Sequence, residues 1–486
     1  MSTHGTVTQE PPGQAGPPPG GQAMEESMVR DLPKPEGLRR LIGPSVILVG
    51  VGVASGEYLL FPFIASKAGL AFLWAALAGV AMQFFINMEI ERYTLATGQT
   101  ALTGFTRLWK PWSLILVFLA LVATVWPGWA TSAATITTFA VGGGNVNTIA
   151  IAGLLAIGIA LTSSPVVYQT VERLELLKVG ALLVFVVIAL FAAISGTAYR
   201  DTSEIATSFG TFPSEIELAI LVGALAAAGA GGANNLVQSN WIRDKGFGMG
   251  HYAPRIVSPI TGEEEAALSG QRYEFPEDEA NMSRWREWWK KANLEQFFSF
   301  AVVAFVSITA FSLIAYSTVY GNPDLPDSSD FSFISLEADV LDDKVGSWFG
   351  TLFLAIGAIS LFAAALGIVD YVSRLVADAV RCGYTEGSKR WTESRLYFVT
   401  VWTMVIVGSS ILLAGFDQPL VLVTISTVLG GFIMFVYSSL LVVTNRRYLS
   451  NSLQLGGYRL AIMGISIVVL GATSVIVGID QFGQLL

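Results

Sequence analysis

Charged residues are scarce in this sequence of 486 residues, in which Asp, Glu, Lys and Arg together make up 13% of the chain. Cysteine and histidine are scarcer still: Cys382 is the one cysteine, and neither His4 nor His251 lies in an apolar stretch. These absences exclude a disulfide framework, a cysteine-based metal centre and histidine chemistry within the apolar part of the chain. No paired acidic residues stand in the apolar stretches and no loop is long enough for a folded domain. We therefore expect neither an enzyme nor a cofactor-dependent protein.

Long apolar stretches dominate instead, with 53% hydrophobic residues and a mean hydropathy of +0.58, which is typical of a polytopic membrane protein. A spanning helix needs about 20 mainly apolar residues. By that rule the sequence predicts eleven spans, at about 41–65, 70–92, 113–138, 147–164, 174–196, 216–241, 294–320, 346–372, 395–415, 418–444 and 458–482. Residues 1–36 are rich in Pro, Gly and Gln and are predicted to form a disordered cytoplasmic tail.

Basic residues predict the orientation. With the N-terminus inside, 25 of the 28 Lys and Arg residues fall on the cytoplasmic side, and only Lys67, Arg200 and Lys344 fall outside. We therefore predict a multi-pass protein of the plasma (inner) membrane, with a cytoplasmic N-terminus, a C-terminus outside and no nucleic-acid partner. Residues 243–292 are predicted to form a cytoplasmic insertion that ends in an amphipathic helix at the surface of the lipid bilayer.

One charged residue, Glu57, lies within the first span, where no other charge occurs from Leu41 to Ser66. A carboxylate at that depth costs several kcal/mol unless it has a partner or water. Small residues precede it and Pro62 follows, a pattern that favours an interrupted helix. We predict a substrate-binding site here, in which Ser55 and Gly56 add hydroxyl and backbone oxygens to the Glu57 carboxylate.

A second interruption is predicted in the sixth span, where Gly229, Gly231 and Gly232 each weaken a helix by roughly 1 kcal/mol relative to alanine. Secondary transporters often repeat a five-helix unit with inverted topology, and the first helix of each unit is broken at the binding site. Alternatively, the glycines allow close helix packing and the amides that follow bond between helices. The residues that we expect to complete the substrate site from this span are Gly229, Gly232, Asn234, Asn235 and Gln238.

Five short motifs can be compared with known transporters: Gly43-Pro44-Ser45, Ala54-Ser55-Gly56-Glu57, Met82-Gln83 with Ala96-Thr97-Gly98, Tyr168-Gln169-Thr170-Val171-Glu172, and Gly232-Ala233-Asn234-Asn235-Leu236. They resemble motifs of the Nramp (natural-resistance-associated macrophage protein) transporters of divalent metals, the fourth being similar to that family's loop between spans four and five. The resemblance implies an all-α polytopic membrane protein with a LeuT-type inverted-repeat transporter fold. It places the first repeat at 37–200, the second at 212–445 and a peripheral span within 446–486.

The site motifs depart from the family's pattern. Ala54 stands at the family's metal-binding Asp, Gly232 at its Met and Asn234 at its His, whereas Gly56 and Asn235 match. The loss of the thioether removes the ligand that favours soft metals. A single carboxylate with amide and backbone oxygens suits a hard cation such as Mg²⁺.

The resemblance therefore implies alternating-access transport of Mg²⁺ (or Mn²⁺), with Glu57 and Asn235 as metal ligands. The third span has no ionisable side chain that could carry protons, which implies transport without proton coupling. An organic solute or a monovalent cation moved by the same fold is the alternative. In transporters of this architecture span eight faces the first broken helix and can hold a coupling ion. Asp370, in span eight, is our candidate ligand for such an ion. The alternative is that Asp370 forms an ion pair with Arg374, four residues later.

Overall fold

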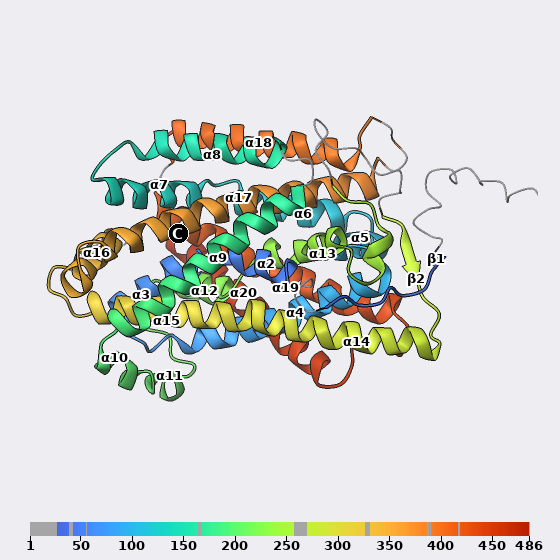
Figure 1. Cartoon of the computed structure of the whole chain (residues 1–486), viewed down its shortest axis with the longest axis horizontal. Coiled ribbons are helices and arrows are strands. Elements are labelled where there is room, and N and C mark those ends of the chain that lie inside the picture. The colour runs from blue at the N-terminus through green and yellow to red at the C-terminus, as the bar shows by residue number, and fades with distance from the viewer. Residues whose placement is uncertain are drawn as a thin grey trace, which may run out of the picture.

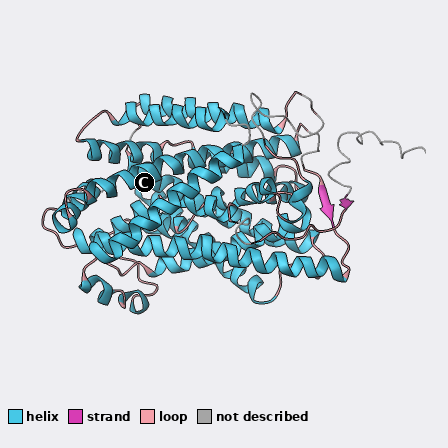
Figure 2. Cartoon of the chain, in the orientation of Figure 1, coloured by secondary structure: helices cyan, strands magenta, loops and turns pink. Residues whose placement is uncertain are grey.

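The computed structural model describes residues 27–37, 42–54, 56–163, 167–256, 270–325, 331–385, 388, 390–416 and 418–485. Almost all of these residues lie in helices (Figure 2). The elements in chain order are β1 (Ser27–Val29), α2 (Pro44–Gly52), η1 (Gly56–Leu60), α3 (Phe61–Ala68), α4 (Trp74–Thr97), α5 (Ala101–Leu108), α6 (Trp112–Thr124), α7 (Gly128–Val141), α8 (Val146–Ser163), α9 (Val167–Ala192), α10 (Gly196–Asp201), α11 (Glu204–Thr207), α12 (Leu218–Ala227), α13 (Ala233–Lys245), η2 (Gly248–Tyr252), β2 (Arg272–Glu274), α14 (Glu279–Gln296), η3 (Phe297–Val302), α15 (Val303–Thr318), α16 (Ser332–Val345), α17 (Phe349–Gly383), α18 (Glu393–Leu413), α19 (Pro419–Tyr448) and α20 (Gly457–Leu485).

Helices occur at all eleven predicted spans. Among the described residues, nine are long and apolar enough to cross a membrane. The predicted second span, α4, is not among them because Glu89, Glu91 and Arg92 lower the hydropathy of its second half. The predicted sixth span is not among them because α12 has only ten residues before the chain leaves the helix. The total of eleven spans stays a prediction.

Both predicted interruptions are present. The first span consists of α2, an irregular turn, the π-helical segment η1 and α3, and the sixth consists of α12 and α13 with residues 228–232 between them. A third interruption, which we did not predict, divides the third span into α6 and α7 at Trp126 and Pro127. Proline causes it, because its ring clashes with the carbonyl four residues earlier in a helix and it has no N–H to donate.

Helix α17 lies at the centre of the bundle and packs against α2, α6, α7, α9, α13 and α18. Helices α8 and α18 pack side by side as an outer layer at the top of Figure 1. Helices α10, α11 and α16 gather at one end of the molecule, and β1, β2 and α5 gather at the opposite end. The broken helices α2 and α12–α13 are enclosed between these ends, so the backbone that leaves the helix is surrounded by protein rather than lipid.

Residues 168–172 belong to the first turns of α9, whereas the resemblance placed them in a loop. No glycine or proline interrupts the sequence from Val167 to Leu177, so nothing in it ends a helix there. The expected position of this loop was therefore wrong.

Part of the predicted tail is ordered. Ser27–Val29 pairs in parallel with Arg272–Glu274, and Leu32 is fully buried. The backbone N–H of Leu32 donates to Asn281 Oδ1 at 2.9 Å, and Trp288 donates through its indole to the Pro33 carbonyl at 2.8 Å. The prediction of disorder is therefore wrong for this part of the tail, because its backbone groups find partners on α14.

The same contacts correct the amphipathic helix that we expected at the bilayer surface. Helix α14 continues through η3 into α15 as one helix from Glu279 to Thr318. Trp285 and Trp288 are buried against residues of the tail and of the insertion, including Leu32, Phe247 and Phe275. Protein covers these tryptophans instead of lipid headgroups.

We predict that Leu32→Ala loosens the tail segment, because truncating a buried leucine costs about 2–5 kcal/mol. Tryptic cleavage after the exposed Arg30, followed by mass spectrometry, should become roughly tenfold faster or more in this variant. The matched control is Val29→Ala, whose side chain is 64% exposed and whose cleavage rate should not change. An equal rate in wild type and Leu32→Ala would contradict the docking of the segment.

Candidate functional site

The two helix breaks lie against each other. A Cβ atom added to Gly52 would overlap the Gly229 carbonyl, and one added to Gly56 would lie 2.5 Å from the carbonyl oxygen of Ala227. Side chains at these two positions would push the broken helices apart, so glycine is required for the approach. The predicted pairing of the two breaks is therefore present in the structure.

Glycine also fits the shape of the second break. Gly229, Gly231 and Gly232 have φ angles of 100°, 84° and 61°, in a region that residues with a Cβ rarely adopt. Gly232 stands immediately before α13, and its carbonyl accepts a hydrogen bond from the Tyr437 hydroxyl at 3.2 Å. These glycines form a turn between two half-helices. From the sequence we had predicted only that they weaken the helix.

Gln83 on α4 satisfies the backbone that this turn exposes. Its Nε2 donates to the carbonyl oxygens of Ala226 and Ala228 at 3.1 and 2.7 Å. Its Oε1 accepts from the backbone N–H groups of Ala230 and Gly231 at 3.0 and 2.9 Å. A backbone group that is unsatisfied within a membrane costs several kcal/mol, so Gln83 is a main reason that the break can exist.

Glu57 lies beside the two breaks and is fully buried. Within the described part of the chain, neither of its carboxylate oxygens has a hydrogen-bond partner of normal geometry. The backbone N–H groups of Ala54 and Gly229 and the Lys178 ammonium act on it electrostatically. Ser55, the other predicted donor of oxygen from this span, lies outside the described residues.

A cavity of about 40 Å³ adjoins the second break, and this volume holds about three water molecules. Gly232 and Asn234 line it, with Thr124, Trp129 and Tyr371 on other sides. Among the predicted site residues, Gly56, Glu57, Gly229, Asn235 and Gln238 do not line this cavity in the structure.

The three predicted amides all use their nitrogen atoms. Asn234 Nδ2 donates to the Leu48 carbonyl at 3.1 Å, and Gln238 Nε2 donates to Gln296 Oε1 at 2.7 Å. Asn235 Nδ2 donates toward α4, to Gln83 Oε1 at 3.2 Å and to Asn87 Oδ1 at 2.6 Å. The oxygens of Asn234, Asn235 and Gln238 are buried and have no hydrogen-bond partner among the described residues.

Asp370, the candidate ligand for a coupling ion, is fully buried and well supplied with donors. Arg374 Nε lies 2.8 Å from its Oδ2, the Tyr397 hydroxyl donates at 2.8 Å, and the Trp241 indole donates at 3.1 Å. The ion pair with Arg374 that the sequence offered as the alternative is thus present. A coupling ion would have to compete with these donors.

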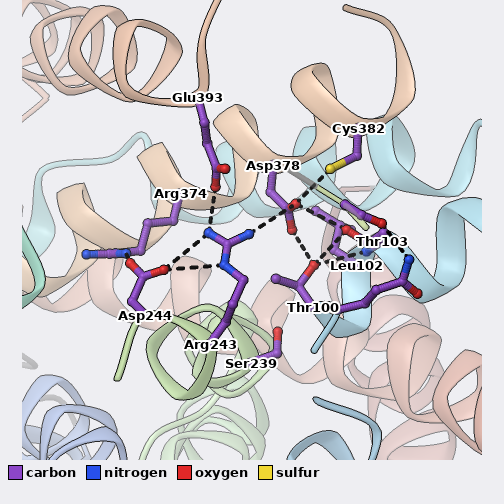
Figure 3. Close-up of polar contacts among 12 residues, drawn as sticks. Thr100, Leu102, Thr103, Ser239, Arg243, Asp244, Arg374, Asp378, Cys382 and Glu393 are labelled. Atoms are coloured by element: carbon purple, nitrogen blue, oxygen red, sulfur yellow. Dashed lines mark hydrogen bonds and ion pairs between the residues drawn. The ribbon is translucent and has the colours of Figure 1, made fainter. Parts of the chain in front are cut away.

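Arg374 belongs to a larger cluster that ties α13 to α17 and α18 (Figure 3). It lies 2.5 Å from Asp244, while the neighbouring Arg243 reaches Glu393 at 2.6 Å and lies 4.0 Å from Asp378. Both arginines are buried, although their positions in the sequence placed them among the cytoplasmic charges. Lys178, also counted as a loop charge, lies inside α9 and is 4% exposed. A single apolar stretch cannot reveal the pairs Arg374–Asp244 and Arg243–Glu393, whose partners are far apart in sequence.

The described residues contain no group of three or more His, Cys, Asp or Glu side chains that could hold a metal ion. A cation bound by Glu57 would therefore have no cluster of carboxylates around it among these residues. Amide and backbone oxygens would have to supply the remaining ligands, as hard cations permit.

A family model described as natural resistance-associated macrophage protein-like (Nramp) matches residues 64–480. The match begins after η1, so Glu57 lies outside it. No curated relative matches the sequence.

Solved transporters have a similar structure. A variant of the manganese transporter of Eremococcus coleocola is 12% identical, with a TM-score of 0.64 over 93% of this chain and 89% of that chain. Mhp1, a nucleobase-cation-symport-1 family transporter with bromovinylhydantoin bound, is 12% identical, with a TM-score of 0.53 over 91% of this chain and 92% of that chain. These likenesses show the fold alone, and they confirm the predicted LeuT-type fold.

We predict that Gln83→Leu destabilises the protein by about 3 kcal/mol or more, because it removes the partner of several buried backbone groups that each cost about 1–3 kcal/mol when unsatisfied. Thermal unfolding of the purified protein in detergent measures this loss as a lower midpoint temperature. Leu77→Ala on the same helix is the control, since its side chain is 52% exposed and its midpoint should stay near that of wild type. An unchanged midpoint for Gln83→Leu would contradict this role, because water or another group would then supply the hydrogen bonds of the exposed backbone groups.

Proposed function

Because the chain belongs to the natural resistance-associated macrophage protein-like family, whose members are metal-ion membrane transporters and not enzymes, we propose that it carries a hard divalent cation by alternating access. The preferred ion in this proposal is Mg²⁺, with Mn²⁺ as the next candidate. The substrate ligands would come from the two facing breaks.

The observation that carries this proposal is the state of the buried oxygen atoms. Glu57 presents a carboxylate whose oxygens have no hydrogen-bond partner of normal geometry within the described residues, while the backbone N–H groups of Ala54 and Gly229 act on it electrostatically. The amide nitrogens of Asn234, Asn235 and Gln238 donate to neighbouring oxygens. Their amide oxygens accept no hydrogen bond from the described residues. Oxygen atoms without donors are what a hard cation requires, whereas an anionic substrate would need the amide nitrogens.

The choice of Mg²⁺ depends on what the site lacks. Gly232 stands where the family has a thioether ligand, so soft metals gain no advantage over hard ones. The side chains of α6 and α7, from Trp112 to Val141, include no ionisable group. We therefore also propose that transport proceeds without proton movement along this span.

One observation favours a second candidate, an organic solute. The cavity beside the second break is lined by Trp129 and Tyr371 and by no carboxylate. Aromatic rings and hydroxyl groups suit a small uncharged molecule or an organic cation. Glu57, which does not line this cavity, would then determine which charge of solute is preferred.

The membrane arrangement is part of the same proposal. We assign the end of the molecule with β1, β2 and α13 to the cytoplasm, with the C-terminus outside and the inner membrane as location. The proposed repeats remain 37–200 and 212–445, with α20 peripheral to them.

The test is Mg²⁺ and Mn²⁺ uptake into proteoliposomes that contain the full-length protein, read with an internal indicator. Glu57→Gln should lower the flux about tenfold or more, because a charge-assisted contact is worth about 1.5–3 kcal/mol. Glu217→Gln is the matched control: this carboxylate is exposed at the start of α12 and its loss should leave the flux unchanged.

Two outcomes would overturn the proposal. If neither ion binds to the purified protein nor enters the vesicles, the divalent substrate is wrong, and a panel of organic solutes tests the second candidate. If uptake of either ion is the same in wild type and Glu57→Gln, the ligand assignment is wrong.

A further inference from the structure

A buried ammonium bridges the first broken helix and the central helix α17. Lys178, on α9, donates through Nζ to the backbone carbonyl of Gly50 on α2 and to that of Ser360 on α17 at 3.3 Å. Glu175, one turn earlier on α9, lies 3.2 Å from the same nitrogen and is fully buried. The ammonium thus sits among three oxygen atoms from three helices.

The Gly50 carbonyl is available because α2 ends there. Helix α2 stops at Gly52, and the N–H of Ala54, which would bond to Gly50 in a continuous helix, bonds to Gly52 at 2.6 Å instead. The carbonyl end of a helix carries partial negative charge, which attracts a cation. Unwound carbonyls and half-helix C-terminal ends are also the groups that bind coupling cations in transporters built on broken helices.

Glycine at position 50 allows the acidic partner to approach. A Cβ atom there would overlap the Glu175 carboxylate, so α2 and α9 pack with Glu175 directly against the helix end. Apart from the contact with Lys178, neither Glu175 oxygen has a hydrogen-bond partner within the described residues. The carboxylate therefore depends on the ammonium for its charge balance.

We propose that Lys178 is a tethered cation that occupies a coupling-ion position between α2 and α17, and that removing it creates a site for a monovalent cation. The three oxygens from Gly50, Ser360 and Glu175 hold the ammonium as they would hold a free Na⁺. Transport by the wild-type protein is then independent of Na⁺ and K⁺. This inference deepens the proposed transport function, since the interface between the first broken helix and α17 has to rearrange during alternating access.

The nearby ionisable groups are consistent with this assignment. Glu57 lies within electrostatic reach of Lys178, and Asp370 acts on Glu175. Asp370 is already engaged by Arg374, so it is less available to a free cation than the Glu175 carboxylate would be without Lys178. Asp370 remains the competing candidate for a coupling-ion ligand.

The first experiment compares Lys178→Ala with wild type by thermal unfolding in detergent, in choline, Na⁺ and K⁺ chloride at equal ionic strength. Wild type should show one midpoint temperature in all three salts. Lys178→Ala should have a lower midpoint in choline and recover in Na⁺ or K⁺, because a ligand that binds the folded state raises its stability. Glu175→Gln combined with Lys178→Ala should lose this recovery.

Lys344→Ala is the control for loss of a lysine. Its side chain also donates to a backbone carbonyl, that of Ser317, but it belongs to α16, which lies at one end of the molecule and not beside the breaks. Its unfolding should be the same in the three salts. A Lys178→Ala midpoint that is equally low in all salts would overturn the proposal.

Uptake into proteoliposomes gives a second readout, and its first part needs only the wild-type protein. Wild-type uptake should be the same with choline, Na⁺ or K⁺ in the medium, and Na⁺-dependent uptake by wild type would overturn the proposal even if Lys178→Ala does not fold. In Lys178→Ala, uptake should fall roughly tenfold or more in choline and return in Na⁺. Because the salt-dependent unfolding needs no transported substrate, failure of the Mg²⁺ proposal and failure of this one give different results.

Discussion

The two helix breaks inside this protein free buried backbone groups that lipid cannot satisfy, and the arrangement of the core around the breaks follows from that constraint. At the second break, a single glutamine on α4 serves two carbonyls and two N–H groups. At the first break, Lys178 and Asn234 donate to the carbonyls of Gly50 and Leu48. The breaks are thus held by side chains from other helices.

The same constraint explains why so many charged residues are buried in an apolar protein. Glu57 and Lys178 lie close to the breaks, where helix ends and free carbonyls provide partial charges that substitute for water. Toward the end with α5 and β2, Arg243 and Arg374 join α13 to α17 and α18 (Figure 3). Separating a buried ion pair is costly, so this cluster holds α13 against α17 and α18.

Local patterns in the sequence were enough for much of the fold. The apolar stretches predicted the positions of the helices, and glycines beside polar residues predicted both breaks. The break at Pro127 was missed because the hydropathy of the third span is continuous across it. The docking of Leu32 was missed because a short polar tail gives no sign of the distant residues, such as Asn281 and Trp288, that bind its backbone.

By itself the sequence determined the membrane class, the two broken helices, the family and the position of the one carboxylate in the first span, because each depends on residues that are close together in the chain. Only the tertiary structure decided which polar atoms are already used. It shows that Trp241 and Tyr397 also donate to Asp370, that Gln83 holds the second break open, and that Lys178 lies against the end of α2. These outcomes depend on side chains from helices that are remote in sequence and meet only in the folded bundle.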